Sequence, residues 1–124
     1  MTWKWTHLIA AMAGGGLGAG LRFSASWYTA TMRWNLQQAS LATLAVNVVG
    51  CLLIGLVLGG QRLDEDWHRV LLVTGVLGGL TTFSALGWET FALFEVHGVG
   101  RAAFYVALHL SLGLGAVFLG SKLA

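Results

Sequence analysis

The sequence has no proline, a single cysteine and few charged residues. Of its 124 residues, 10% are charged and 56% are hydrophobic, whereas soluble domains carry about 25% charged residues. So few charges cannot cover the surface of a soluble globule. The lone thiol, Cys51, can form no internal disulfide and has no metal-ligand spacing around it. The apolar content also excludes disordered and collagen-like chains, which leaves a lipid bilayer as the expected solvent.

Several classes of function are excluded as well. The seven basic residues are scattered singly from Lys4 to Lys122, so they form no basic patch for nucleic acid. The sequence contains no ATP-binding motif, no cofactor motif and no nucleophile paired with a base, which argues against an enzyme. Arg22 interrupts the first apolar stretch, so a cleaved signal peptide is not expected there.

Four apolar stretches separated by polar connections predict four transmembrane helices. A bilayer core about 30 Å thick needs roughly 20 apolar residues per helix, and the stretches cover residues 6–28, 41–60, 70–95 and 102–121. We therefore expect an all-α, multi-pass protein that forms one transmembrane domain over residues 1–124. The expected location is the cytoplasmic (inner) membrane of a cell.

The flanking cations give only a weak signal for orientation. The cytoplasmic side of a membrane protein usually carries the excess of Lys and Arg. The side with both termini holds four such residues, and the opposite side holds two or three, depending on where Arg22 is placed. This balance allows insertion in both orientations, and thus an antiparallel homodimer, but it equally allows one orientation. The residues are Lys4, Arg62, Arg69 and Lys122 on the first side, and Arg33 and Arg101 on the second.

Glycine is abundant, at 18 residues, and it recurs in pairs four residues apart. Helices in lipid gain no hydrophobic energy by meeting, so small residues at this spacing allow the close backbone contact that holds them together. We expect tight helix packing at the pairs Gly14 and Gly18, Gly16 and Gly20, Gly55 and Gly59, and Gly75 and Gly79.

The second stretch places Thr43 and Asn47 on one helix face, at i and i+4. An asparagine amide offers two donated hydrogens and an acceptor oxygen, and an unpaired polar group in lipid is costly. Asn47 therefore either bonds a neighbouring helix or replaces water around a passing ion. The helix alone does not decide between these two roles.

The centre of the third stretch predicts a broken helix. It runs from Gly75 to Ser84 and holds adjacent glycines beside three hydroxyl residues. A break would free backbone carbonyls that can coordinate a cation, while the alternative is a continuous helix whose hydroxyls bond to the preceding turn. Phe83 lies in this segment, and its positive ring edge can favour an anion in a narrow pore. Packing against helices or lipid is the commoner role of such a ring.

Three further polar residues fall within the apolar stretches. Glu89 lies late in the third, and Tyr105 and His109 share one face of the fourth. Ionisable groups are expensive inside a bilayer, which makes such residues functional candidates. Glu89 is also close enough to the end of its stretch to lie in water.

Taken together, these residues resemble the Fluc/CrcB family of small fluoride channels. The resemblance rests on three segments in this order: Gly14–Ala19 followed by Arg22, then Thr43–Gly50, then Gly75–Ser84 followed by Glu89. The Gly-Gly-Leu-Thr-Thr-Phe-Ser core of the third segment is the most specific of them.

The resemblance implies an antiparallel, dual-topology homodimer that exports fluoride passively through two pathways, each lined by both subunits. It also implies a structural sodium ion at the dimer interface, bound by the backbone carbonyls of Gly78 and Thr81. The residues that the resemblance assigns to the fluoride pathway are Arg22, Thr43, Asn47, Thr82, Phe83, Ser84, Tyr105 and His109.

The sequence departs from the family pattern at a few positions. The family motif typically has a second phenylalanine three residues after the first, where this chain has Leu86, and His109 and Gly113 stand where the family often has serine. A non-conducting subunit that takes its second aromatic ring from a paralogue therefore stays open. A small multidrug-type dual-topology exporter is another alternative. Those exporters carry a functional glutamate in the first span, where this chain has Arg22 and no carboxylate.

Overall fold

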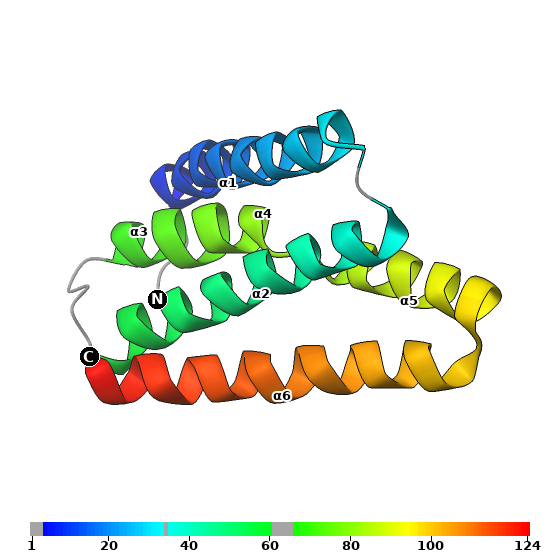
Figure 1. The fold of residues 1–124 in the computed structure, drawn as a ribbon. Coiled ribbons are helices and arrows are strands. Elements are labelled where there is room, and N and C mark those ends of the chain that lie inside the picture. The colour runs from blue at the N-terminus through cyan, green and yellow to red at the C-terminus, as the bar shows by residue number, and fades with distance from the viewer. Residues whose placement is uncertain (1–3, 34, 61–65) are drawn as a thin grey trace.

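The computed structural model describes residues 4–33, 35–60 and 66–124, and the regular structure in these ranges is entirely helical. The long helices run up and down as an antiparallel bundle, so that α1 begins and α6 ends at the same end of it (Figure 1). Helix α1 packs mainly on the first half of the third span, and α2 packs mainly on α6. Arg62, one of the cations used above to judge orientation, lies outside the described residues.

Among the described residues, four helices are long and apolar enough to cross a membrane, which confirms the predicted number of spans. They are α1 (Trp5–Thr31), α2 (Leu36–Gly59), the segment Asp66–His97 and α6 (Val99–Leu123). Helix α2 begins earlier than predicted because Asn35 caps it. The Asn35 side chain accepts from the Gln38 amide at 2.9 Å, and the Gln38 side chain accepts from the Asn35 amide at 3.0 Å. This capping box extends the helix beyond its apolar residues.

The third span is built from four consecutive pieces. These are α3 (Asp66–Arg69), the π-helical segment η1 (Val70–Leu77), α4 (Gly78–Leu80) and, after a break, α5 (Phe83–His97). The connection from α5 to α6 is the single residue Gly98, whose φ of 80° and ψ of 177° lie in a region open essentially only to glycine. The predicted break near the middle of this span is therefore present.

Glycines bring α1 into backbone contact with the third span, and α2 into backbone contact with α6. Three of the four predicted glycine pairs lie at these contacts. A Cβ atom on Gly75 would lie 2.8 Å from the Gly14 Cα, and one on Gly79 would lie 2.6 Å from the Gly15 carbonyl oxygen. A Cβ on Gly59 would similarly lie 2.6 Å from the Ser121 Cα of α6. The pair Gly16 and Gly20 differs, because added Cβ atoms there would meet nothing within 4 Å. These two glycines face away from the rest of the chain.

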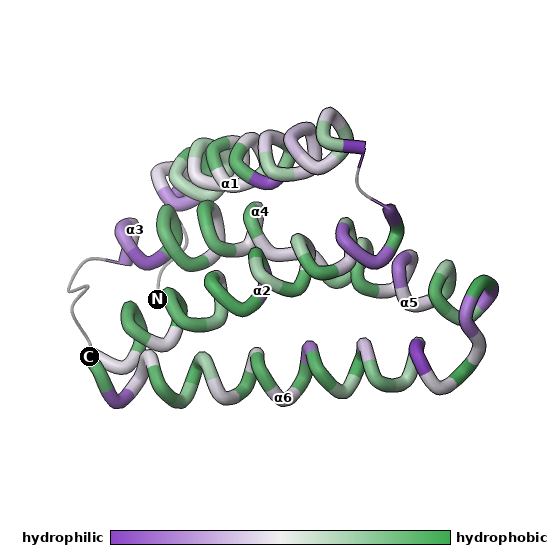
Figure 2. The backbone as a smooth tube through the Cα atoms, in the orientation of Figure 1, coloured by the Kyte–Doolittle hydropathy of each residue, from purple (hydrophilic) through white to green (hydrophobic). Residues whose placement is uncertain are grey.

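The bundle has a small core and an apolar exterior. The buried cluster consists of Leu44, Leu86, Leu93 and Tyr105, whereas large apolar side chains are exposed along all the spans. Hydrophobic residues dominate the lengths of the helices, and many of the hydrophilic ones gather near helix ends and connections (Figure 2). An apolar exterior of this extent is typical of a surface that meets lipid or another protein.

Candidate functional site

The break in the third span lies at Thr81 and Thr82, whose backbones are extended. Thr81 has φ −77° and ψ 153°, and Thr82 has φ −147° and ψ 121°. In a continuous helix the Thr82 amide would donate to the Gly78 carbonyl. It donates instead to Oδ1 of Asn47 at 2.9 Å, while Nδ2 of Asn47 donates to the Thr82 carbonyl at 3.2 Å. The Asn47 side chain, which comes from α2, thus bonds both the N–H and the C=O of Thr82.

These bonds resolve part of the question that the sequence left open about Asn47. Its amide does bond a neighbouring element, and the partner is the unwound backbone rather than another side chain. The bond to Thr82 uses one of the two Nδ2 hydrogens, so the second is left for another acceptor. The same residue is therefore able both to hold the break open and to contact a ligand.

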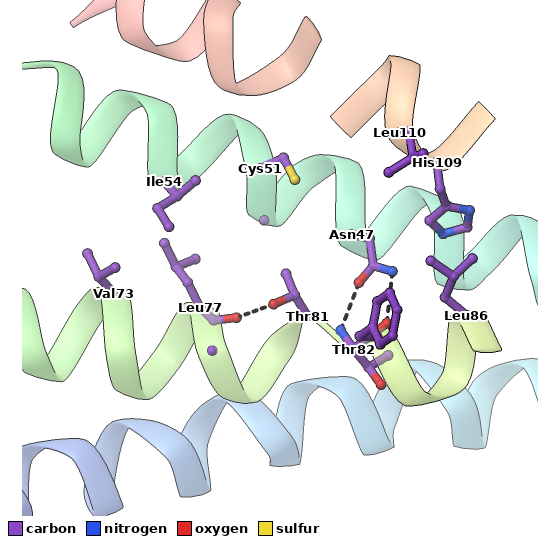
Figure 3. Close-up of a pocket in the computed structure, with 13 residues that line it drawn as sticks. Asn47, Cys51, Ile54, Val73, Leu77, Thr81, Thr82, Leu86, His109 and Leu110 are labelled. Carbon is purple, nitrogen blue, oxygen red and sulfur yellow. Dashed lines mark hydrogen bonds between the residues drawn. The ribbon is translucent and has the colours of Figure 1, made fainter. Parts of the chain in front are cut away.

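A pocket of about 350 Å³ lies against the break (Figure 3). Asn47 and Cys51 enter it from α2, Leu86 from α5 and His109 from α6. Six of the sequence-predicted site residues line this pocket: Asn47, Gly78, Thr81, Thr82, Phe83 and His109. Most of the other lining residues are apolar, so the polar side-chain groups in the pocket include one amide, two hydroxyls and one imidazole.

Phe83 and Ser84 have different positions at the start of α5. The ring of Phe83 lines the pocket, yet 85% of the side chain is exposed in a single chain. Ser84 lies outside the lining, and its Oγ is 3.2 Å from Oγ1 of Thr82. Oγ1 of Thr82 also accepts from the Ala85 amide at 3.2 Å and so caps α5.

A second cavity, of about 240 Å³, lies between α1, α2 and α5. Arg22, Thr43, Thr82 and Glu89 are among its lining residues. Nε of Arg22 donates to the Gly79 carbonyl at 3.1 Å, which caps the last turn before the break. No salt bridge joins Arg22 to Glu89 in the described part of the chain, although both side chains line this cavity. Thr82 lines both cavities.

Glu89 is held by hydroxyl groups from two other helices. Oγ1 of Thr43 donates to one carboxylate oxygen at 2.6 Å, and the Tyr105 hydroxyl lies 2.5 Å from the other. The Tyr105 hydroxyl is also 3.0 Å from the Ser40 carbonyl. Sequence reasoning did not predict this cluster. A carboxylate in an apolar stretch indicates that Glu89 needs hydrogen-bond partners. It does not indicate which residues those partners are.

Tyr105 and His109 share one face of α6, as their spacing predicted, but only His109 lines the pocket at the break. Their rings meet edge to face, with centroids 4.5 Å apart. Tyr105 points to the Glu89 cluster and does not line the pocket at the break, whereas His109 does. Thr43 and Asn47 separate in the same way, because Thr43 bonds Glu89 and Asn47 bonds Thr82.

The chemistry at the break suits a sodium ion only in part. Both Gly78 and Thr81 line the pocket, and the Gly78 carbonyl has lost its helical donor to Asn47. Uncoupled carbonyl oxygens are suitable ligands for Na⁺. Two oxygens from one chain do not complete a coordination shell for this ion. No group of three His, Cys, Asp or Glu side chains that could hold a metal occurs among the described residues.

The sequence profile of the family described as "CrcB-like protein, Camphor Resistance (CrcB)" matches residues 9–121 of the chain. The chain belongs to the CrcB family. A CrcB relative from Roseiflexus sp. (strain RS-1), named fluoride-specific ion channel FluC, is 43% identical over 121 residues, which cover 95% of this chain and 96% of the relative.

Other relatives carry the same name. The protein from Methylobacillus flagellatus is 41% identical over 122 residues, which cover 94% of this chain and 93% of the relative. That from Agrobacterium fabrum is 41% identical over 120 residues, which cover 94% of both chains. CrcB membership and the four apolar helices together make this chain a multi-pass membrane protein of an ion-channel family, not an enzyme.

Proposed function

We propose that this chain is a fluoride-selective passive channel that exports fluoride across the cytoplasmic membrane. The observation that carries the proposal is the broken third span with Asn47 bonded to Thr82, in a chain whose relatives are named fluoride-specific ion channels. Fluoride is small and strongly hydrated, so a narrow pathway has to replace its water with fixed donors yet bind it weakly enough to release it. No covalent chemistry is needed.

The donors proposed for this pathway are the side chains that border the two cavities. In the pocket at the break they are the free Nδ2 hydrogen of Asn47, the hydroxyl of Thr82 and the edge of the Phe83 ring. Ser84 is a hydroxyl partner of Thr82. In the second cavity the Arg22 guanidinium attracts the anion, and Thr43 lines its route beside Glu89. Tyr105 bonds Glu89 from outside this cavity. An interior-negative membrane potential drives an anion outward along such a route.

The proposed assembly is an antiparallel homodimer with two pores and a sodium ion at its interface. Phe83 supports a second copy, because its ring is largely exposed at the border of the ion pocket in a single chain. The outward-facing Gly16 and Gly20 offer a further surface for close helix contact. The sodium ion would take the carbonyls of Gly78 and Thr81 from each copy, which gives the oxygen ligands that one chain lacks.

Purified protein in liposomes loaded with potassium fluoride tests the channel. With valinomycin present to carry potassium, we expect a fluoride electrode to record rapid efflux, and liposomes loaded with potassium chloride to retain their chloride. Absence of fluoride efflux from a folded, monodisperse protein would contradict the proposal. Efflux driven only by a proton gradient would indicate the multidrug-type exporter instead. Glu89 argues against that exporter, since its carboxylate is already bonded to Thr43 and Tyr105.

Leu86 keeps one alternative open, the non-conducting subunit. Leu86 is 8% exposed and belongs to the buried cluster, yet it also lines the pocket at the break. A leucine has no positive ring edge to offer an anion there. We expect the wild-type chain to conduct and Leu86→Phe to conduct faster in the same efflux assay. Conduction by Leu86→Phe alone would instead favour a subunit that borrows its ring from a paralogue.

A further inference from the structure

His109 presents a buried ring nitrogen that has no partner. The side chain is 7% exposed, and its Nδ1 lies 3.3 Å from the Tyr105 carbonyl oxygen one turn earlier on α6. A carbonyl oxygen only accepts hydrogen bonds, so this contact places a proton on Nδ1. The Nε2 of a neutral His109 ring therefore carries a bare lone pair.

The bare Nε2 belongs to the pocket at the break. It is fully buried, and no hydrogen-bond partner reaches it in the described structure. The ring projects from α6 toward the space between Asn47 and Leu86 (Figure 3). A buried polar atom without a partner is rare and costly in folded proteins. The pocket itself, where an ion or water would sit beside the amide of Asn47, is the place from which such a partner can come.

We propose that His109 is a protonation-dependent fluoride ligand of this pathway, which binds the anion through Nε2–H only as the imidazolium. The proposal rests on the proposed channel function and adds a regulation to it. The neutral ring directs a lone pair at the passing anion and repels it, whereas the protonated ring offers both a donated hydrogen and a positive charge. Fluoride efflux consequently rises as the pH falls.

His109 lies where it can supply the fluoride contacts that Leu86 does not. Leu86 faces the same space from α5 and supplies neither a donor nor a positive ring edge. The imidazolium of His109 supplies both from α6. Its ring contacts the Tyr105 ring edge to face, at a centroid distance of 4.5 Å.

Three other titratable side chains lie near His109 on the helices packed around it. Tyr105 is on α6, Glu89 on α5 bonds Tyr105, and Cys51 on α2 lines the same pocket. Their reference pKa values are about 10, about 4.3 and about 8.5, whereas that of imidazole is about 6.5. The pH dependence of fluoride efflux is also measured for Glu89→Gln and Cys51→Ser. A pH response that comes from His109 should persist in each of these variants that conducts.

The test is fluoride efflux from liposomes with equal pH on both sides, from about pH 8 to about pH 6, an interval around the reference imidazole pKa. Protein-free liposomes correct for leakage of hydrogen fluoride. Because the protonated fraction of an imidazole rises as the pH falls, we expect a several-fold rise in efflux across this interval for the wild type. His109→Gln, which keeps a polar side chain but does not titrate, should conduct with a flat profile. His97→Gln, which removes an exposed histidine at the end of α5, should retain the rise.

A second measurement uses the unmodified protein. If fluoride binds the imidazolium, fluoride must in turn stabilise that protonated form. We expect the titration midpoint of the His109 ring, followed by ¹⁵N NMR, to move to higher pH in sodium fluoride than in sodium chloride. This readout applies even where His109→Gln does not fold.

The outcomes separate the two proposals. A conducting wild type with a flat pH profile, a His109→Gln variant that keeps the rise, or an NMR midpoint that fluoride does not move would each overturn the role of His109 and leave the channel standing. A folded wild type that passes no fluoride at any pH would overturn the channel, and the role of His109 with it.

Discussion

Asn47 supplies the unwound backbone with the hydrogen-bond partners that a neighbouring turn supplies within a helix. Its carbonyl and amide bond the N–H and C=O of Thr82, two groups that would otherwise lack partners at a depth where unpaired backbone is not tolerated. One residue thus stabilises the break and borders the pocket at the break. Substitutions at Asn47 are expected to affect both properties, and the choice of substitution decides which effect dominates.

The Asn47→Asp substitution separates the two roles. A carboxylate oxygen still accepts from the Thr82 amide, but the donor to the Thr82 carbonyl is lost and a negative charge faces the pocket. Like charges about 4 Å apart repel by roughly 4 kcal/mol at an effective dielectric of 20. We expect fluoride efflux to fall by more than about tenfold while the protein remains folded. Asn35→Asp, which keeps the cap of α2 outside the pocket, is the matched control and should conduct as the wild type does.

The break was predicted from the sequence, but the partners of the candidate residues were not. The adjacency of glycines and hydroxyl residues predicted the break, and the i, i+4 spacing placed Tyr105 and His109 on one helix face, where their rings meet. The same spacing placed Thr43 and Asn47 on one face, but their partners Glu89 and Thr82 are distant in sequence. Such pairing depends on how α2 and α5 are rotated against each other, and a single sequence carries no information on that rotation.

At the scale of elements, the third span is two half-helices with separate caps. Arg22 bonds the Gly79 carbonyl before the break, and Oγ1 of Thr82 accepts from the Ala85 amide after it. Each half therefore ends or begins with its own partner for the backbone groups that the break leaves unpaired. The structure of the break is a property of these caps as well as of the flexible glycines.

Removing the cap of α5 should destabilise the second half-helix. Thr82→Ala deletes the acceptor for the Ala85 amide, a loss worth about 1 kcal/mol for a typical N-cap. We expect a lower midpoint of thermal unfolding in detergent, measured by circular dichroism. Thr82→Ser keeps an oxygen at the same position and should unfold close to the wild type. Equal destabilisation by both variants would show that the methyl group, not the cap, is what matters.

Glycine packing between α1 and η1 gives a second test at this scale. A Cβ on Gly14 would overlap the Leu71 carbonyl oxygen, a backbone atom that cannot move aside alone. Gly14→Ala should therefore cost about 1–3 kcal/mol, as overpacking usually does, and should lower the unfolding midpoint. Gly16→Ala, on the same helix with open space around it, should not destabilise the isolated chain. Lowered stability of Gly16→Ala only where dimers form would locate the partner surface.

At the scale of the whole molecule, the sequence predicted the number of spans but not their packing. The number of spans depends on the length of the apolar stretches alone, and the described residues contain four such helices where four stretches were expected. The assignment of α1 to η1 and of α2 to α6 depends on glycines that meet across the bundle, such as Gly55 with Gly120. The glycine spacing indicated that close contacts would form without indicating which helices would share them.

Dual topology can be measured on single-cysteine variants. In a Cys51→Ser background, Lys122→Cys places a thiol at the end of α6, and Arg101→Cys places one at its beginning. We expect a membrane-impermeant maleimide to label about half of each variant in intact cells, because half of the copies would face each way. Complete labelling of one variant together with complete protection of the other would contradict the antiparallel dimer.

The bonds between Asn47 and Thr82 also have a consequence for folding. The amide that stabilises the break comes from an earlier span of the same polypeptide. These two bonds therefore need no second molecule to form. In the proposed dimer, each copy would bring its own ready-made bend to the encounter.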